Sequence, residues 1–355
     1  MSRAKEPQKP FLPFGNPFRM ISPKGSQLSP KLLRLLNQFE ETLAGRIKML
    51  KPAAKEDILS LSWMRCAVEL LCGIHSDIKS LITDLEFPVC DWDDKWIDLY
   101  LDNSVKLLDL CISFSSEISR MKQGQLFLQC ALHNLGADSS KQFVRARSSL
   151  DGWRQHITSK NPRLDNCFCV MDGLAQMLEL PKIKNSAKGK VLMQAMYGVK
   201  VATLFICSVF AAAFSGSTEK LMDLKVSETY LWAKAFSDLQ IFVNTEIRNT
   251  DSSRRMTVLK ELEAVDTGVQ KLYPIVQDGV DPVEAKILQN SASDLGRFSD
   301  KLSLGLDLLA KEVDRFFQIV LTGRDALLGN IRTRIGDSIS DQVETRKKKL
   351  GPAIR

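Results

Sequence analysis

The sequence predicts an all-α fold, an elongated antiparallel helical bundle with long heptad-patterned helices and an irregular N-terminal arm. Three observations support this prediction. Apolar residues recur at three- and four-residue spacing over long stretches, which is the period of one helix face. No stretch alternates apolar and polar residues with enrichment in Val, Ile and Thr, and no Asn-Gly or Asp-Gly turn separates such runs. The composition, 355 residues with 44% hydrophobic and 26% charged, is that of a globular protein.

Residues 1–28 form the predicted arm. They contain five prolines and two glycines, too many breakers for a helix or a strand. Five basic residues there accompany a single acid, Glu6. A disordered terminus is the simpler interpretation, and a plastid transit peptide is the alternative, because such peptides are basic and poor in acids. The few hydroxyl side chains and the lack of an amphipathic stretch count against that alternative.

The first predicted helix runs from Pro30 to about Leu50. Ser29 can cap it, and Pro30 suits the first helical position, where a missing N–H costs nothing. We expect a second helix from about Glu56 to Leu85 and a third from about Asp91. The residues predicted to face the core in these three helices are Leu32, Leu36, Phe39, Leu43, Ile47 and Leu50; Trp63, Cys66, Leu70, Ile74, Ile78, Leu81 and Leu85; and Ile97, Leu101, Val105, Leu108 and Ile112.

Shorter helices are expected after Gly124, followed by a long one near the C-terminus. Their predicted core positions are Phe143, Ala146, Leu150, Trp153 and Ile157; Val258, Leu262, Val265, Val269, Leu272 and Val276; and Leu302, Leu306, Leu309, Val313, Phe316 and Val320. The bundle is predicted to span residues 29–335. Residues 336–355 are predicted to be a basic, disordered tail, with an anionic-surface contact or an import signal as alternatives for its four consecutive cations, 346–349.

The sequence lacks the motifs of a catalytic or metal-binding site. The three histidines are isolated from one another, and no phosphate-binding glycine loop is present. The acidic cluster Asp91-Trp92-Asp93-Asp94 could ligate a divalent cation, but adjacent acids are also what the positive end of a helix favours. We therefore expect no enzymatic activity, no cofactor and no metal.

Cysteine usage and charge bear on the compartment and the partners. The eight cysteines have no CxxC spacing and are typical of small core residues in a reducing compartment. The first thirty residues contain no apolar signal-peptide region. These features predict an intracellular protein. The net charge of +7 is mild, and aromatic residues do not interleave the basic stretches, so nucleic acid is not an expected partner.

Residues 181–218 contain no acid and supply the candidate site residues. Four lysines are candidates for contact with an anionic surface or a partner: Lys182, Lys184, Lys188 and Lys190. The apolar run 201–214 follows, and its candidate membrane or core-helix residues are Val201, Leu204, Phe205, Ile206, Val209, Phe210 and Phe214. Fourteen residues are short of the roughly 20 that span a bilayer, and extending the run back to Val191 places Lys200 inside it. A helix buried in the bundle is the favoured interpretation, and a membrane-inserted or interfacial segment is the alternative.

Several strings along the chain resemble the plant BYPASS family. They are PFGNPFR (13–19), DWDDKWIDLYLDNSVKLLDLC (91–111), LDGWRQHITSKNPRLDNC (150–167), LPKIKNSAKGKVLMQAMYGVK (180–200), FAAAFSGS (210–217) and TVLKELEAVDTGVQKLYP (257–274). The resemblance covers nearly the whole chain. It carries over no catalytic residues, because the family has none established.

The resemblance implies a non-enzymatic regulator of plant root and shoot development. Such proteins restrain production of a root-derived mobile signal, linked to carotenoid-derived compounds, that arrests shoot and leaf growth. Together with the long helical faces, this implies action through an unknown protein partner or through membrane contact near residues 182–214. Two alternatives stay open, an enzyme of apocarotenoid signal metabolism and a membrane-peripheral trafficking adaptor. The expected location is cytoplasmic or endomembrane-associated, with the chloroplast as alternative.

Overall fold

The computed structural model describes residues 28–52, 54–86, 94–136, 140–159, 161–176, 178, 186–219, 221–251, 259–278 and 282–349. This part of the chain is helical and contains no strand, which confirms the predicted all-α class. The helices are α1 Pro30–Leu50, α2 Leu61–Asp84, α3 Asp94–Leu135, α4 Ser140–Thr158, α5 Pro162–Gln176, α6 Ala187–Ser215, α7 Ala233–Asp251, α8 Lys260–Asp278 and α9 Pro282–Lys349, with a short 3-10 helix at Lys55–Asp57. The predicted arm falls almost wholly outside the described residues.

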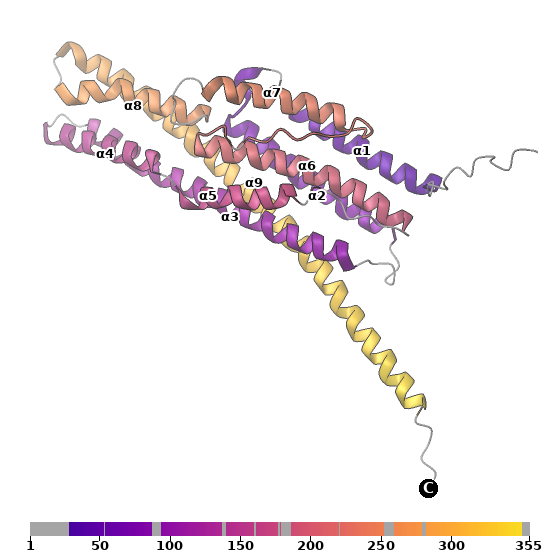
Figure 1. Ribbon diagram of the computed structural model, residues 1–355. Helices are drawn as coiled ribbons and strands as arrows, with labels where there is room; N and C mark the ends of the chain where they lie inside the picture. The colour runs from indigo at the N-terminus through magenta and orange to yellow at the C-terminus, as the bar shows by residue number, and fades with distance from the viewer. Residues whose placement is uncertain are drawn as a thin grey trace, which may run out of the picture.

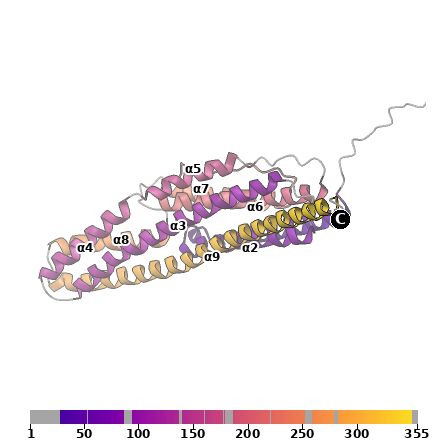
Figure 2. The same cartoon turned by 90° about the horizontal axis from the view of Figure 1, so that it is seen from below.

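Two long helices, α3 and α9, organise the molecule. They pack against each other, and α9 also packs against α2 and α8 while α3 packs against α4 and α5. The outline is long and narrow, and the C-terminal part of α9 extends beyond the other helices (Figures 1 and 2). The end of α3, the start of α4, the end of α8 and the start of α9 lie at the same end of the molecule (Figure 1), so α3 and α4 are antiparallel, and so are α8 and α9.

The two ends of the bundle are built differently. At one end α4 and α8 pack on each other and on the long helices α3 and α9, which makes a four-helix arrangement. At the other end α6 lies among α1, α2 and α5 and also contacts α3 and α7. Because α6 has helices on several sides, its side chains are buried nearly all round, from Val191 to Phe214. An all-round apolar helix is stable only in such surroundings or in lipid.

The helix starts follow local capping chemistry. The Ser29 hydroxyl accepts a hydrogen bond from the backbone N–H of Leu32 at 3.4 Å, as predicted for α1. The start of α2 was predicted too early, at Glu56, whereas the helix begins at Leu61. Leu59 adopts a left-handed φ of 63°, which interrupts any helix, and the Ser60 hydroxyl then caps α2 by accepting from Trp63 N–H.

The predicted core faces are largely confirmed. The predicted positions of α1 and the C-terminal stripe 302–320 are all buried. The face predicted for α3 was wrong, because Val105 and Ile112 are 41% and 45% exposed. The buried residues of α3 include Leu107, Leu110, Cys111, Phe114, Ile118 and Met121. This helix packs against α4 and α5 as well as α9, so its buried surface is wider than one stripe. Cys66 of α2 is also exposed rather than buried.

The C-terminal helix runs past the boundary that we expected at residue 335. It continues to Lys349, into the segment 336–355 that was predicted to be a disordered tail. The division of the chain into arm, bundle and tail stays a prediction. The cluster 91–93, the valine 258 and the lysines 182 and 184 lie outside the described residues.

Candidate functional site

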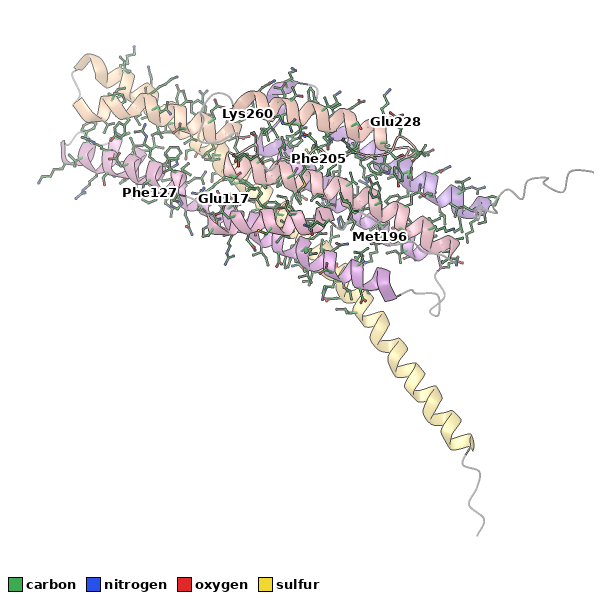
Figure 3. All side chains as sticks on the ribbon, viewed as in Figure 1. Glu117, Phe127, Met196, Phe205, Glu228 and Lys260 are labelled. Carbon is green, nitrogen blue, oxygen red and sulfur yellow. The ribbon has the colours of Figure 1, made fainter. Side chains whose placement is uncertain are left out.

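A cavity opens between α2, α3, α5, α6 and α9. Its lining residues are His75 and Ile78; Tyr100, Asn103, Ser104 and Leu107; Leu174 and Leu178; Met196, Val199, Lys200, Thr203 and Leu204; and Val320. Figure 3 labels Met196, which lies on α6, with Phe205 farther along the same helix. The cavity has about 60 Å³ of space for water-sized molecules, several times the roughly 10–15 Å³ that one water needs. The walls are mostly aliphatic, with a few polar side chains.

One of these polar side chains has no partner. The amide of Asn103 is only 7% exposed, yet neither its Nδ2 nor its Oδ1 has a hydrogen-bond partner in the structure. Its neighbour Ser104 differs, because the Ser104 hydroxyl donates to the Leu101 carbonyl at 2.7 Å and accepts from Arg324 at 3.1 Å. Buried polar groups are nearly always hydrogen-bonded, and leaving one unpaired costs about 1–3 kcal/mol. The Asn103 amide therefore needs a water or ligand group as its partner.

Two basic side chains also line the cavity. The Nε2 of His75 lies 3.3 Å from the Thr203 hydroxyl, and Thr203 in turn donates to the Val199 carbonyl at 2.7 Å. Burial lowers the pKa of His75 from 6.5 to about 4, so its ring is neutral at neutral pH. Burial, and then the nearby Lys106 ammonium, lowers the pKa of Lys200 from 10.5 to about 8. Lys200 therefore remains largely cationic at neutral pH in an apolar wall.

A second polar cluster lies on α3, where Glu117 is fully buried. The Arg120 guanidinium donates to both Glu117 carboxylate oxygens, with Nε at 2.9 Å from Oε2, and Asn161 Nδ2 donates to the same Oε2 at 2.8 Å. Arg120 also donates to the backbone carbonyl of His156 at 2.6 Å, and the His156 ring bonds to the carbonyl of Arg120 at 2.8 Å. These bonds tie α3 to α4 and to the start of α5. Since every member is used in holding helices together, the cluster is structural.

The predicted lysine cluster is only partly described. Lys188 Nζ donates to the backbone carbonyl of Glu86, at the C-terminal end of α2, at 2.7 Å. Lys190 is half-buried in the first turn of α6. Lys188 thus binds an orphan carbonyl next to a helix end, which basic side chains commonly do. A role of Lys182, Lys184, Lys188 and Lys190 in contact with an anionic surface stays a prediction.

The predicted apolar residues lie together in the interior of the bundle. Val201, Leu204, Phe205, Ile206, Val209, Phe210 and Phe214 are at most 7% exposed. The Phe205 ring packs edge-on against Phe236 of α7 at 5.5 Å, and Phe210 lies 5.5 Å from Phe114 of α3. Within the described residues α6 is also the one helix long and apolar enough to cross a membrane. Length and composition alone do not distinguish a helix of the bundle core from a membrane-spanning helix.

Sequence reasoning missed the cavity. The visible signals were Lys200, a cation inside the acid-free apolar segment, and the adjacent polar pair Asn103-Ser104 among the apolar positions of α3. Neither signal predicts that α3 and α6 place these residues around the same cavity. In the part of the chain that the structure describes, no three His, Cys, Asp or Glu side chains gather as metal ligands. The cysteines of the described residues are free thiols.

Comparisons with known proteins identify the family. The family model described as Protein BPS1 matches residues 89–313, and the model described as Protein ROH1-like matches residues 22–152. The chain is 54% identical to Protein BPS1, chloroplastic, of Arabidopsis thaliana, over all of this chain and 99% of that protein. It is 46% identical to UPF0496 protein 4 of Oryza sativa subsp. indica over 82% of this chain and 65% of that protein.

More distantly, the chain is 20% identical to Protein ROH1D of Arabidopsis thaliana, over 86% of this chain and 89% of that protein. No solved structure is similar to it. The match to the Protein BPS1 model covers more than half of the chain, and the Arabidopsis relative is similar from end to end. The chain therefore belongs to the BYPASS family, the family of Protein BPS1.

Proposed function

We propose that this BYPASS-family protein is a non-enzymatic regulator of plant root and shoot development. In this role it restrains production of a root-derived mobile, carotenoid-linked signal that arrests shoot and leaf growth. The observation that carries the proposal is the end-to-end similarity to Protein BPS1, at 54% identity with both chains covered almost completely. Similarity that extends over the whole aligned length supports a shared activity.

Grafting tests this function directly. Roots that lack the protein are joined to normal shoots, and the reciprocal graft is the control. The proposal predicts arrested shoots only above the deficient roots, and relief of the arrest when carotenoid synthesis in those roots is blocked. Normal shoots above deficient roots would contradict the function, and arrest that persists without carotenoids would contradict the identity of the signal.

The mode of action that we propose is contact with a protein partner through exposed helix faces. Val105 and Ile112 of α3 lie two turns apart and are both exposed, at 41% and 45%, and Leu304 and Leu308 of α9 are exposed as well. Exposed aliphatic side chains on one face of a helix support contact with a protein partner. Replacing Val105 and Ile112 by serine should abolish rescue of a deficient plant while leaving the protein folded, and full rescue by the double variant would contradict this face.

An enzyme of apocarotenoid metabolism is the first alternative. It draws on the cavity, whose wall contains a neutral imidazole and a cation of lowered pKa. Incubation of purified full-length protein with apocarotenoid aldehydes, followed by chromatography, tests it. Turnover that disappears in a Lys200→Met variant would replace the regulatory proposal with this one.

A membrane-peripheral trafficking adaptor is the second alternative, and it concerns location as well. We propose a cytoplasmic or endomembrane-associated protein, with the chloroplast as the alternative that the name of the Arabidopsis relative favours. A fluorescent fusion of the full chain, compared with one of residues 29–355, shows whether the N-terminal arm directs the protein to plastids. Membrane pellets washed with alkaline carbonate retain the protein if α6 is inserted and release it if α6 lies in the bundle core.

A further inference from the structure

The cavity between α2, α3, α5, α6 and α9 suggests a ligand-binding property in addition to the developmental role. It combines an apolar wall with a small number of polar groups, which is the usual makeup of a small-molecule site. Eight of its fourteen lining residues are aliphatic or methionine, and its space exceeds that of a single water. The inference rests on this cavity alone and holds whether or not the proposed function does.

The unpaired amide of Asn103 indicates which chemistry belongs in the cavity. Asn103 offers two N–H donors on Nδ2 and an acceptor oxygen, Oδ1, and the structure leaves both atoms without a partner although the residue is only 7% exposed. An ionised carboxylate accepts a hydrogen bond from Nδ2 through one of its oxygens, and a water held by its other oxygen can donate to Oδ1.

The charge of the wall selects among the ligands that can accept a hydrogen bond from Nδ2. Lys200 of α6 lines the same cavity, and its ammonium group attracts an ionised carboxylate, has no net attraction for an alcohol and repels an amine. Low polarity around Lys200 strengthens this preference. His75, which is neutral and engages Thr203, adds no competing charge.

We propose that this cavity binds a small carboxylic acid with an apolar body. The carboxyl group meets the Asn103 amide beside Lys200, and the apolar body lies against aliphatic residues such as Ile78, Met196 and Val320. Ordered water alone on Asn103 is the competing explanation, and the experiment below separates the two.

Methionine-methyl NMR of the full chain provides the test. Met196 lines the cavity, and its methyl resonance among those of the 11 methionines is assigned with a Met196→Leu variant. Butanoate, 1-butanol and butylamine are titrated separately, because they are small enough for a cavity of about 60 Å³, share one apolar chain and differ in the head group. The proposal predicts a saturable Met196 shift with butanoate, at a dissociation constant at least tenfold below those of the other two. The absence of a saturable shift would overturn it in favour of water, and equal affinities for all three probes would overturn it by showing that the cavity does not select the head group.

Variants of the two polar residues sharpen the result. Asn103→Leu should weaken butanoate binding at least tenfold, and Asn103→Asp should shift the preference toward butylamine, because the introduced carboxylate repels an ionised acid and attracts an amine. Lys200→Met should remove the advantage of butanoate over 1-butanol, whereas Lys234→Met, on the exposed face of α7, is the matched control and should change nothing. The other methionine resonances report whether each variant is folded. Butanoate binding that is unchanged in folded Asn103→Leu would refute the site.

Discussion

The buried ion pair of Glu117 and Arg120 makes the sharpest stability prediction. Replacing Arg120 by leucine removes the guanidinium but leaves the Glu117 carboxylate, whose side chain is 0% exposed, in the protein interior. Among the described residues, Asn161 would remain as the hydrogen-bond partner of this carboxylate, at 2.8 Å. Breaking a buried pair from one side costs about 3–5 kcal/mol, because the remaining charge is uncompensated. We therefore expect Arg120→Leu to lower the free energy of unfolding by that amount.

A matched surface pair and a double variant make the reasoning testable. Arg297 pairs with Asp294 at the same three-residue spacing in α9, but both side chains are about 60% exposed, so Arg297→Leu should cost at most about 1 kcal/mol. Glu117→Gln combined with Arg120→Leu removes both charges and should recover part of the loss, since an amide is cheaper to bury than a lone carboxylate.

Urea unfolding followed by far-UV circular dichroism measures all of these free energies. The explanation would be refuted if Arg120→Leu cost no more than Arg297→Leu. It would equally be refuted if the double variant were no more stable than Arg120→Leu, because the loss would then come from packing rather than from an unpaired charge.

Three further predictions concern a helix contact, a cap and a titration. Gly305→Ala should lower the free energy of unfolding by about 1–3 kcal/mol, because a Cβ at this position would lie 3.0 Å from the Cβ of Leu61. Gly45→Ala is the control, since nothing lies within 4 Å of a Cβ there, and it should raise the free energy of unfolding by up to about 1 kcal/mol in the same urea assay. Glu261→Ala should cost about 1–2 kcal/mol in thermal unfolding, because the Glu261 carboxylate accepts from Leu61 N–H at 3.0 Å and so links the start of α2 to α8. Burial lowers the pKa of His75 from 6.5 to about 4 in the folded protein. Between these two pH values the unfolded chain binds a proton at His75 and the folded chain does not. The free energy of unfolding should therefore fall by at most about 3 kcal/mol as the pH drops from 6.5 to 4. A His75→Gln variant that lost stability over the same range as steeply as the unmodified protein would contradict the assignment to His75.

Local sequence signals predicted much of the fold because helices are local structures. The cap at Ser29, the proline at position 30 and the stripe from Leu32 to Leu50 all act within one segment, and α1 formed where they indicated. The start of α2 could not be predicted in the same way. Leu59 takes its left-handed conformation in a buried turn, where its carbonyl accepts from Lys260 N–H at 3.3 Å, a contact with a distant part of the chain.

Tertiary packing explains what sequence reasoning missed in α3 and in the cavity. A single stripe is expected for a helix with one neighbour, but α3 has several, and so Ser104 and Asn103 are buried while Val105 is exposed. The candidate site depends on the same effect. Asn103 and Lys200 line the same cavity only because α3 and α6 lie on either side of it. No local pattern in either segment predicts this arrangement.

The apolar helix α6 shows why composition alone left two interpretations open, and how packing weighs between them. A bilayer and a bundle core both favour an all-round apolar helix, so the run 201–214 suits either. Insertion into lipid, however, would take α6 away from the residues that it covers. Trp232, Phe236 and Leu43, each at most 1% exposed, pack around Gly198 and Phe205 of α6. Exposing side chains of this size to water costs about 1.5–3 kcal/mol each, and Lys200 would add a charge to the inserted segment. The free energy gained by inserting α6 into lipid must therefore exceed the cost of exposing the side chains that α6 covers on and next to α1 and α7. For this reason we expect the carbonate wash to release the protein.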